Sequence, residues 1–441
     1  MKKAFILSLA AITFIGFAGL SQNIDREKLD TYFRALAEHN RLMGSVAIAQ
    51  GDSLIYSKTV GFADVEQEMK ANEQSKYRIG SITKTFTAVL TLKALEENLL
   101  SLNQTIDKWF PTIGYAEKIT IEHLLRHRSG LHNFTDEWVR SGRHTQPKTE
   151  QEMIETIVKS GNDFVPNART SYSNAGYFLL TFILERIYEK PFSEIVETKI
   201  ANPIGLKNTR LGEKINTQNN ELNSYTFLNN AWNREAETDM SQVLGAGAII
   251  STPTDLVKFS HALFSGKLIS ENSLQQMTSI KDHFGMGIIQ MPFHHRVGFG
   301  HTGGIDGFRS MFAYFPDGEI SFALTANGVN FNINDIAIVL LSAAYGKSFE
   351  IPELAIFDAT DVDLSQFAGV YSSRQIPLQM TITQENHQLF GQATGQPAFP
   401  LEMTAKNRFE FRQAGLVLEF NPAENTMILR QGGGVFNFER E

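Results

Sequence analysis

A serine and a lysine stand three residues apart in the segment Arg78-Ile79-Gly80-Ser81-Ile82-Thr83-Lys84, where a helical pattern begins. Side chains at positions i and i+3 of a helix share one face, so we expect Ser81 and Lys84 to lie together. A serine hydroxyl becomes a nucleophile when a base removes its proton, and a lysine whose ammonium form is disfavoured can supply that base. The free N–H groups at a helix start would also stabilise the oxyanion formed by attack on a carbonyl. The pattern is common by chance and needs companions.

One companion is Ser171-Tyr172-Ser173-Asn174. The Tyr172 phenol can lie between Ser81 and a leaving group, where it could transfer a proton. The Asn174 amide can accept from Lys84 through its oxygen and donate to substrate carbonyls through its nitrogen.

A second companion is the segment Gly300-His301-Thr302-Gly303-Gly304, which stands just ahead of a strand-like segment. It would line the opposite wall of a cleft, with the Gly304 N–H as a second oxyanion donor. The three elements occur in the order S-x-x-K, Y-x-N, H-T-G, with a large and mostly helical stretch between the first and the third. Together they are far more specific than any one of them, and they indicate a serine nucleophile.

With these motifs the sequence resembles the serine β-lactamase and penicillin-binding protein superfamily. The resemblance is to its class C-like branch, with D-alanyl-D-alanine carboxypeptidases, D-aminopeptidases and related esterases. Class A enzymes carry S-D-N and K-T-G where this chain has Tyr172-Ser173-Asn174 and His301-Thr302-Gly303. The tyrosine resembles class C, and the histidine resembles the peptidase and esterase members more than efficient class C β-lactamases. Segments 121–131 and 245–252 add to a resemblance that covers residues 27–346.

The resemblance implies a mechanism through an acyl-enzyme on Ser81. Lys84 and Tyr172 would take and return protons, and the N–H groups of Ser81 and Gly304 would hold the oxyanion. Thr302 and His301 would contact a substrate carboxylate, with His301 able to change its charge near neutral pH.

The expected function is hydrolysis of amide or ester bonds, with D-amino-acid peptides or peptidoglycan stem peptides as the favoured substrates. A β-lactamase, or a penicillin-binding or cell-wall sensor protein without turnover, are the alternatives. The partners are then a small-molecule or peptide substrate, with peptidoglycan as a candidate. The chain has no long run of lysine and arginine, so nucleic acid is not expected, and the oligomeric state is open.

No cofactor or metal is expected. The chain has no cysteine, which excludes thiol catalysis and thiolate zinc sites. His123 and His127 are four residues apart, as in some zinc sites, but the His-Glu-x-x-His pattern is missing and the segment matches the family's structural one.

The elements that must position these residues follow from periodicity. Strand signals come from both ends of residues 22–349 and helical signals from the middle. The simplest fold is therefore an antiparallel sheet flanked by helices with an inserted helical subdomain, an α/β plus all-α arrangement, which the resemblance makes β-lactamase-like (transpeptidase-like). The expected elements are a helix over 25–41, a hairpin of 46–49 and 54–56 with 59–64 continuing the second strand, a helix over 83–100, mostly helix to 263, strands over 309–315 and 320–326, and a helix over 336–344.

Both ends of the chain differ in character from this domain. Residues 1–21 start with two lysines and an apolar run, as an export signal peptide does, so we expect a periplasmic or secreted protein; a retained membrane anchor is the alternative. Short alternating segments over 364–441 predict a small all-β domain, joined by a linker over 350–363.

Overall fold

The computed structural model describes residues 24–135, 137, 141–228, 230–352, 354, 362–385 and 388–441. The expected signal peptide and most of the expected linker lie outside these residues. Among the described helices, none is long and apolar enough to cross a membrane.

An antiparallel sheet forms the centre of the larger part of the chain, and its strand order is β10-β11-β12-β13-β1-β2. The two N-terminal strands pair through β1 with β13, which comes almost three hundred residues later. This confirms the predicted sheet built from both ends of the domain. The strands are β1 (Leu42–Gln50), β2 (Ser53–Val60), β10 (Ile289–Phe293), β11 (Arg296–Ile305), β12 (Phe308–Phe315) and β13 (Ile320–Val329).

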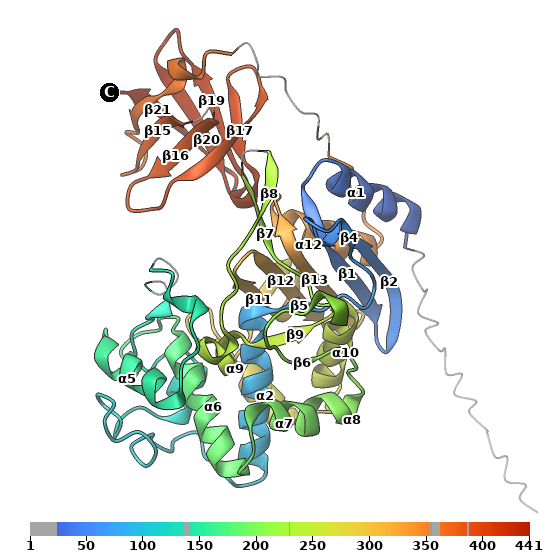
Figure 1. Cartoon of the computed structure of the whole chain (residues 1–441), viewed down its shortest axis with the longest axis vertical. Coiled ribbons are helices and arrows are strands. Elements are labelled where there is room, and N and C mark those ends of the chain that lie inside the picture. The colour runs from blue at the N-terminus through green and yellow to red at the C-terminus, as the bar shows by residue number, and fades with distance from the viewer. Residues whose placement is uncertain are drawn as a thin grey trace, which may run out of the picture.

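Helices cover both faces of this sheet (Figure 1). On one face, α1 (Arg26–Glu38) and α12 (Ile333–Ala344) bury Phe33 and Leu340 in a cluster with the sheet's Phe322. On the other face, α2 (Thr83–Glu96) and α10 (Pro253–Phe264) bury Phe86 and Phe259, whose rings stack with centroids 3.9 Å apart. Burying two faces with apolar side chains fixes the sheet between the helical layers.

The helical subdomain lies beside α2 (Figure 1). Its longest helix, α6, is almost wholly buried and packs against α2 and α9. The elements of this region are α3 (Ile121–Leu125), α5 (Glu150–Ser160), α6 (Asn174–Tyr188), α7 (Phe192–Val196), α8 (Asn202–Ile204), α9 (Leu244–Gly247) and, after the insert, α11 (Glu271–Thr278).

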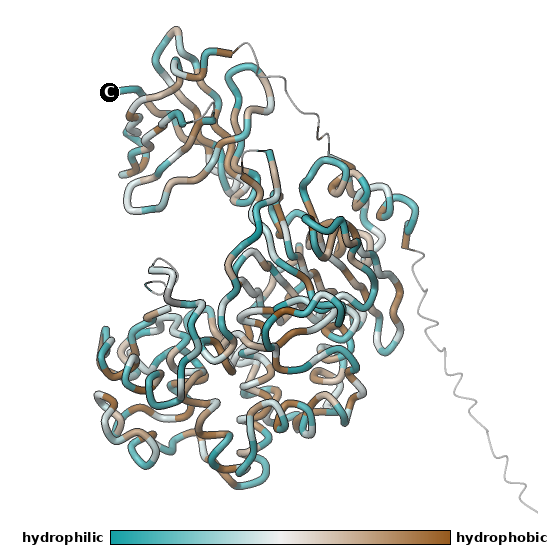
Figure 2. The backbone as a smooth tube through the Cα atoms, viewed as in Figure 1, coloured by the Kyte–Doolittle hydropathy of each residue, from teal (hydrophilic) through white to brown (hydrophobic). Residues whose placement is uncertain are grey.

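The C-terminal residues form a closed eight-stranded barrel, which confirms the predicted all-β domain. Its interior is filled by alternate side chains such as Leu418, Met427 and Phe438. Figure 2 shows brown and teal segments mixed along these strands, as expected for one face buried and one exposed. The strands are β14 (Gly369–Ser372), β15 (Gln379–Glu385), β16 (Gln388–Ala393), β17 (Phe399–Ala405), β18 (Arg408–Phe411), β19 (Leu416–Asn421), β20 (Thr426–Gln431) and β21 (Gly434–Arg440).

One detail of the predicted elements is wrong, and two others are incomplete. The second strand of the first hairpin does not continue through residue 64, because Gly61 has a φ of +86° and the chain turns there into β3 (Phe62–Asp64), which pairs with β4 (Met69–Lys70). The mostly helical stretch also contains the hairpin of β7 (Tyr225–Leu228) and β8 (Ala231–Arg234), and β7 joins the central sheet by pairing with β13. The H-T-G motif stands just ahead of β12, as predicted, and itself lies within strand β11, which the sequence did not indicate. The remaining short strands are β5 (Tyr77–Arg78), β6 (Arg210–Leu211) and β9 (Ile249–Ser251), which form a separate sheet.

Candidate active site

Ser81 lies in a 3₁₀ turn, Gly80–Ile82, that leads directly into α2. The preceding Gly80 has a φ of +50°, a left-handed conformation that favours glycine. A Cβ at Gly80 would also lie 2.8 Å from the Gly304 nitrogen, so the turn and strand β11 touch through backbone alone. This contact places Ser81 beside Gly304, as the motifs predicted.

Lys84 follows one turn later and is completely buried. Its Nζ lies 3.0 Å from Ser81 Oγ, 2.7 Å from Asn174 Oδ1 and 2.8 Å from the Ala246 carbonyl oxygen. Burial lowers the pKa of Lys84 well below its ordinary value, because an ammonium ion loses its hydration there.

The three neighbours of Lys84 decide where its lone pair points. A neutral amine has two N–H bonds and one lone pair. The Ala246 carbonyl and the Asn174 amide oxygen can only accept, so they take the two N–H bonds. The lone pair is then left facing the hydroxyl of Ser81. The arrangement is that of a base next to a nucleophile.

Tyr172 approaches Ser81 from the other side, and its hydroxyl donates to Ser81 Oγ at 2.8 Å. Burial raises the pKa of this phenol above its ordinary value, with the Ser81 hydrogen bond opposing the rise in part. The phenol therefore keeps its proton at neutral pH. This geometry suits Tyr172 as a proton donor and leaves Lys84 as the base.

Asn174 begins α6 and is held by two residues that the motifs did not indicate. Its Nδ2 donates to Asn133 Oδ1 at 3.1 Å and to Thr135 Oγ1 at 2.9 Å. These contacts fix the orientation of the amide, so that its oxygen faces Lys84.

His127 supports Tyr172 and was predicted only as part of a structural segment. Its ring lies 4.4 Å from the Tyr172 ring, and its Nδ1 accepts the Ser173 N–H at 3.2 Å. Burial lowers the pKa of His127 well below its usual value, with Lys84 and His301 as further causes. His123 caps α3 instead, because its side chain accepts the Thr120 N–H. The two histidines therefore have separate structural tasks.

Strand β11 forms the opposite wall and brings the H-T-G motif to Ser81. Its Gly303 packs against the turn so closely that a Cβ would lie 2.0 Å from the Ile79 carbonyl oxygen. Ser310 on the neighbouring strand donates to this same oxygen at 2.8 Å. Only glycine fits at this point of the strand. The next residue, Gly304, is open toward the pocket described below.

His301 is buried in the wall and does not change charge near neutral pH, contrary to expectation. Burial lowers its pKa to about 4, with the nearby Lys84 as a second cause and the hydrogen bond to Thr302 in opposition. Its Nδ1 lies 2.6 Å from the Thr302 carbonyl oxygen, which only accepts, so the neutral ring carries its proton on Nδ1. A neutral ring of this kind offers a substrate carboxylate no positive charge.

A pocket of about 240 Å³ opens beside Ser81 and Gly304. It extends away from them toward Asp306, which follows the H-T-G motif on the chain. The lining residues are Gly80, Ser81, Thr135, His144, Asn174, Phe178, Thr238, Gln242, Val243, Ala246, Gly247, Gly304, Ile305 and Asp306. Sequence reasoning missed His144, Thr238 and Asp306, and no local motif marks them.

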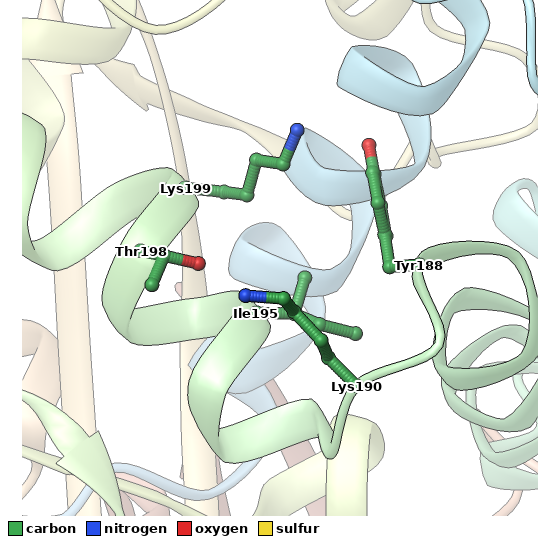
Figure 3. Close-up of a pocket in the computed structure, with 5 residues that line it drawn as sticks. All are labelled: Tyr188, Lys190, Ile195, Thr198 and Lys199. Carbon is green, nitrogen blue, oxygen red and sulfur yellow. The ribbon is translucent and has the colours of Figure 1, made fainter.

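A larger hollow of about 470 Å³ lies near α7, lined by Tyr188, Lys190, Ile195, Thr198 and Lys199 (Figure 3). Lys190 pairs with Glu194 and Lys199 with Glu97. None of the predicted site residues lines this hollow, so the pocket at Ser81 is the candidate site despite its smaller volume.

The described residues contain no group of three or more histidine, cysteine, aspartate or glutamate side chains that could hold a metal ion. The donors around Ser81 are hydroxyl, amine, amide and backbone groups, which form a proton-transfer system.

Comparison with known proteins identifies the family. A family model described as Beta-lactamase matches residues 29–344. The chain belongs to the Beta-lactamase family. This confirms the resemblance drawn from the motifs, and with it a serine hydrolase of β-lactamase-related type.

Among proteins of this family, the chain is 25% identical to penicillin-binding protein 4* of Bacillus subtilis (strain 168), over 92% of this chain and 97% of that protein. It is 26% identical to the teichoic acid D-alanine hydrolase of Staphylococcus aureus (strain MRSA252), over 62% of this chain and 65% of that protein. The first alignment extends beyond the Beta-lactamase match, which ends at residue 344.

Solved structures share the fold. The D-amino acid amidase from Ochrobactrum anthropi SV3, complexed with D-phenylalanine, superposes with a TM-score of 0.62 at 24% identity, over 72% of this chain and 99% of that chain. The octameric penicillin-binding protein homologue from Pyrococcus abyssi superposes with a TM-score of 0.65 at 21% identity, over 94% of this chain and 100% of that chain. The second match covers enough of this chain to include most of its C-terminal barrel.

Proposed function

We propose that the protein hydrolyses amide or ester bonds of D-amino-acid substrates through an acyl-enzyme on Ser81. The observation that carries this proposal is the environment of Lys84: two obligate acceptors take its N–H bonds and leave its lone pair facing the Ser81 hydroxyl. The D-amino-acid substrate class is supported by two similar proteins, a teichoic acid D-alanine hydrolase and a D-amino acid amidase.

The acylation step follows from this geometry. Lys84 takes the Ser81 proton as Ser81 Oγ bonds to the substrate carbonyl carbon. The N–H groups of Ser81 and Gly304 receive the oxyanion. When the bond to the leaving group breaks, the Tyr172 phenol gives the leaving atom its proton and recovers one from Lys84. Because the pKa of Tyr172 is raised, the phenol is a donor in this step and not the initial base.

Deacylation repeats the sequence with water. Water gives a proton to the Tyr172–Lys84 pair as its oxygen bonds to the acyl carbon, and Ser81 leaves with a returned proton. Asn174 holds Lys84 throughout, with Asn133 and Thr135 fixing its amide.

The state of His301 bears on which bond is cleaved. A carboxypeptidase must hold the terminal carboxylate of its substrate, whereas the His301 ring at this wall is neutral and donates its Nδ1 proton to the Thr302 carbonyl oxygen. We therefore favour esters and amides without a terminal carboxylate over D-alanyl-D-alanine peptides. Thr302 stays a proposed substrate contact through its hydroxyl group.

Export and domain division belong to the same proposal. A signal peptide over residues 1–21 would bring the enzyme to D-amino-acid-containing cell-wall polymers, with peptidoglycan as a candidate. The proposed hydrolase domain is 22–349 and the β domain is 364–441, joined by 350–363. The Pyrococcus abyssi homologue is an octamer.

The test is hydrolysis of four substrates by the purified protein beside Ser81→Ala. They are a p-nitrophenyl ester, a D-amino-acid amide, a D-alanyl-D-alanine peptide and a chromogenic cephalosporin. Turnover of the ester and amide that is lost in Ser81→Ala supports the proposal. A preference for the cephalosporin would make the protein a β-lactamase. A fluorophosphonate label on Ser81 without turnover of any substrate would make it a binding or sensor protein.

A further inference from the structure

The pocket beside Ser81 lies on the acyl side of the scissile bond. Its lining includes Ser81 and Gly304, which meet the substrate carbonyl in the proposed mechanism, but not Tyr172, which would protonate the leaving group. The group on the far side of the carbonyl from the leaving group must therefore enter this pocket. A volume of about 240 Å³ suits a single residue.

The far end of the pocket presents hydrogen-bond acceptors. Thr238 donates both its N–H and its hydroxyl proton to the Asp306 carboxylate, the latter at 2.5 Å. Its hydroxyl oxygen has no further proton to give, so toward the pocket it can only accept. His144 contributes a buried Nδ1 with no hydrogen-bond partner in the part of the chain that the structure describes.

The charges around this end leave it negative. Arg78 pairs with both Asp306 and Glu237, and its Nη atoms also donate to the Thr238 and Glu213 carbonyl oxygens. Arg309 on β12 donates to the Asp306 backbone carbonyl oxygen, and its charge interacts at longer range with the carboxylates of Glu235 and Asp306. Two guanidinium groups thus face three carboxylates, and one negative charge is left over. The Asp306 side chain is almost fully buried, where water screens its charge little.

We infer that this end of the pocket binds a free α-ammonium group, so that the substrates are aminoacyl esters or amides with an unblocked amino group, not N-acylated peptides. The Thr238 hydroxyl and His144 Nδ1, with the His144 proton on Nε2, accept from the ammonium, and Asp306 supplies the balancing charge. Phe178, Val243 and Ile305 line the same pocket and give the acyl side chain an apolar wall. The inference rests on the proposed function and narrows its substrate class.

The test compares two substrates that differ only at the amino group, D-alanine p-nitroanilide and N-acetyl-D-alanine p-nitroanilide. The readout is the ratio of their kcat/KM values, which cancels any loss of folded protein in a variant. We expect the free amine to be preferred by at least about tenfold, as for a charge-assisted contact in a buried site. Equal rates, or preference for the acetylated substrate, would overturn the inference.

Two variants test which pocket residues cause the preference for a free amino group. Asp306→Asn keeps the shape and removes the charge, and Thr238→Val removes the acceptor with little change of volume. Each is expected to lower the ratio by about tenfold or more, since each takes away one partner of the ammonium. Glu237→Gln is the comparison variant, because it also removes one negative charge from Arg78 but lies outside the pocket lining, so we expect it to lower the ratio less than Asp306→Asn does. A ratio that stays at the wild-type value in both Asp306→Asn and Thr238→Val contradicts the assignment.

A neutral ester separates this inference from the proposed function. Ser81-dependent hydrolysis of p-nitrophenyl butyrate, which has no ammonium group, reports the acyl-enzyme chemistry alone. If the butyrate is turned over and the amino preference is missing, only the inference fails. If no ester or amide is turned over, the proposed function fails and the inference with it.

Discussion

At the scale of single residues, the proposed mechanism makes the reactivity of Ser81 depend on the protonation state of Lys84. The lysine is buried without a carboxylate partner among its three hydrogen bonds, so nothing in its first contacts compensates an ammonium charge. The neutral amine can make the same three contacts, and its lone pair then faces the Ser81 hydroxyl as a base. A site of this kind should gain activity as pH rises through the lowered pKa of Lys84.

We predict that the rate of Ser81 labelling by a fluorophosphonate rises with pH along a limb whose midpoint is well below the ordinary lysine pKa. Lys84→Met should remove the limb and slow labelling by about 10²–10⁴-fold, the usual contribution of a general base. Stopped-flow labelling between pH 5 and about 10 measures both. If the labelling rate of Lys84→Met rises with pH at the same midpoint as that of the wild type, another group is the base.

His301 should make the protein less stable in acid. Its pKa is about 4 when folded and about 6.5 when unfolded, so between these values the unfolded chain binds more protons. The stability is complete above pH 6.5 and is lost as pH falls toward 4. The full difference corresponds to about 3 kcal/mol or less. Urea unfolding at the two ends of this range should show a smaller loss for His301→Gln than for the wild type; an equal loss would assign the effect to His127 and other groups.

The site residues that the sequence could predict have their partners close by in the chain, and those that it could not predict have distant partners. Ser81 and Lys84 could be predicted because one helical turn joins them. Ala246 and Asp306 could not, since each contacts its partner across more than 150 residues and only the folded chain brings them together. The charge state of His301 was also beyond the sequence, because it depends on burial and not on residue type.

At the scale of elements, the contact of β11 with the turn before α2 aligns the two expected oxyanion donors. Gly303 permits this contact, and we predict that Gly303→Ala lowers kcat/KM by at least about a hundredfold, the usual effect of losing one oxyanion donor. It should also destabilise the fold by about 1–3 kcal/mol through overpacking. Activity on a p-nitrophenyl ester and thermal unfolding measure the two effects.

The matched control is Gly304→Ala, one residue further along the strand. A Cβ there would have no neighbour nearer than 3.6 Å, at Arg309 Nη1, so we expect a much smaller loss. Equal losses in the two variants would show that the glycines act through flexibility and not through close packing.

Strand β11 also shows why one element escaped sequence analysis. Its glycines lack the apolar side chains that mark a strand in the sequence, but the close contacts of this strand leave no room for a Cβ at most of them. A Cβ at Gly300 would lie 1.9 Å from the Phe312 carbonyl oxygen, and one at Gly298 would lie 2.7 Å from the Phe315 ring. By contrast, β12 and β13 were predicted well, because bulky apolar residues form continuous runs there. The sequence therefore predicted the strands that pack through apolar side chains, and it did not predict the strand that packs through its backbone.

At the scale of the whole molecule, the barrel is held against the sheet domain by a largely buried ion pair. Arg41, the residue just before β1, donates to both carboxylate oxygens of Glu402 on β17. The Arg41 side chain is 3% exposed and that of Glu402 is 32% exposed. Gln413 adds a hydrogen bond to the Val329 carbonyl oxygen at 3.3 Å. The alternating segments over 364–441 predicted an all-β domain, but this docking contact joins residues 361 positions apart and has no local signature.

We predict that Arg41→Glu loosens the barrel, because it sets two carboxylates against each other where one is poorly hydrated. The loss of docking free energy should be about 2–4 kcal/mol. This is slightly less than the usual cost of breaking a fully buried ion pair, because Glu402 keeps some contact with water. The reversed pair Arg41→Glu with Glu402→Arg should recover part of the loss, because the introduced guanidinium group faces the new carboxylate but also lies beside Arg412. Arg374→Glu is the matched control, because its pair with Glu439 is exposed on both sides and lies within the barrel. Limited proteolysis and small-angle scattering report the docking directly. If the reversed pair is no better docked than Arg41→Glu alone, the barrel is held by its backbone and apolar contacts, and the ion pair does not determine its position.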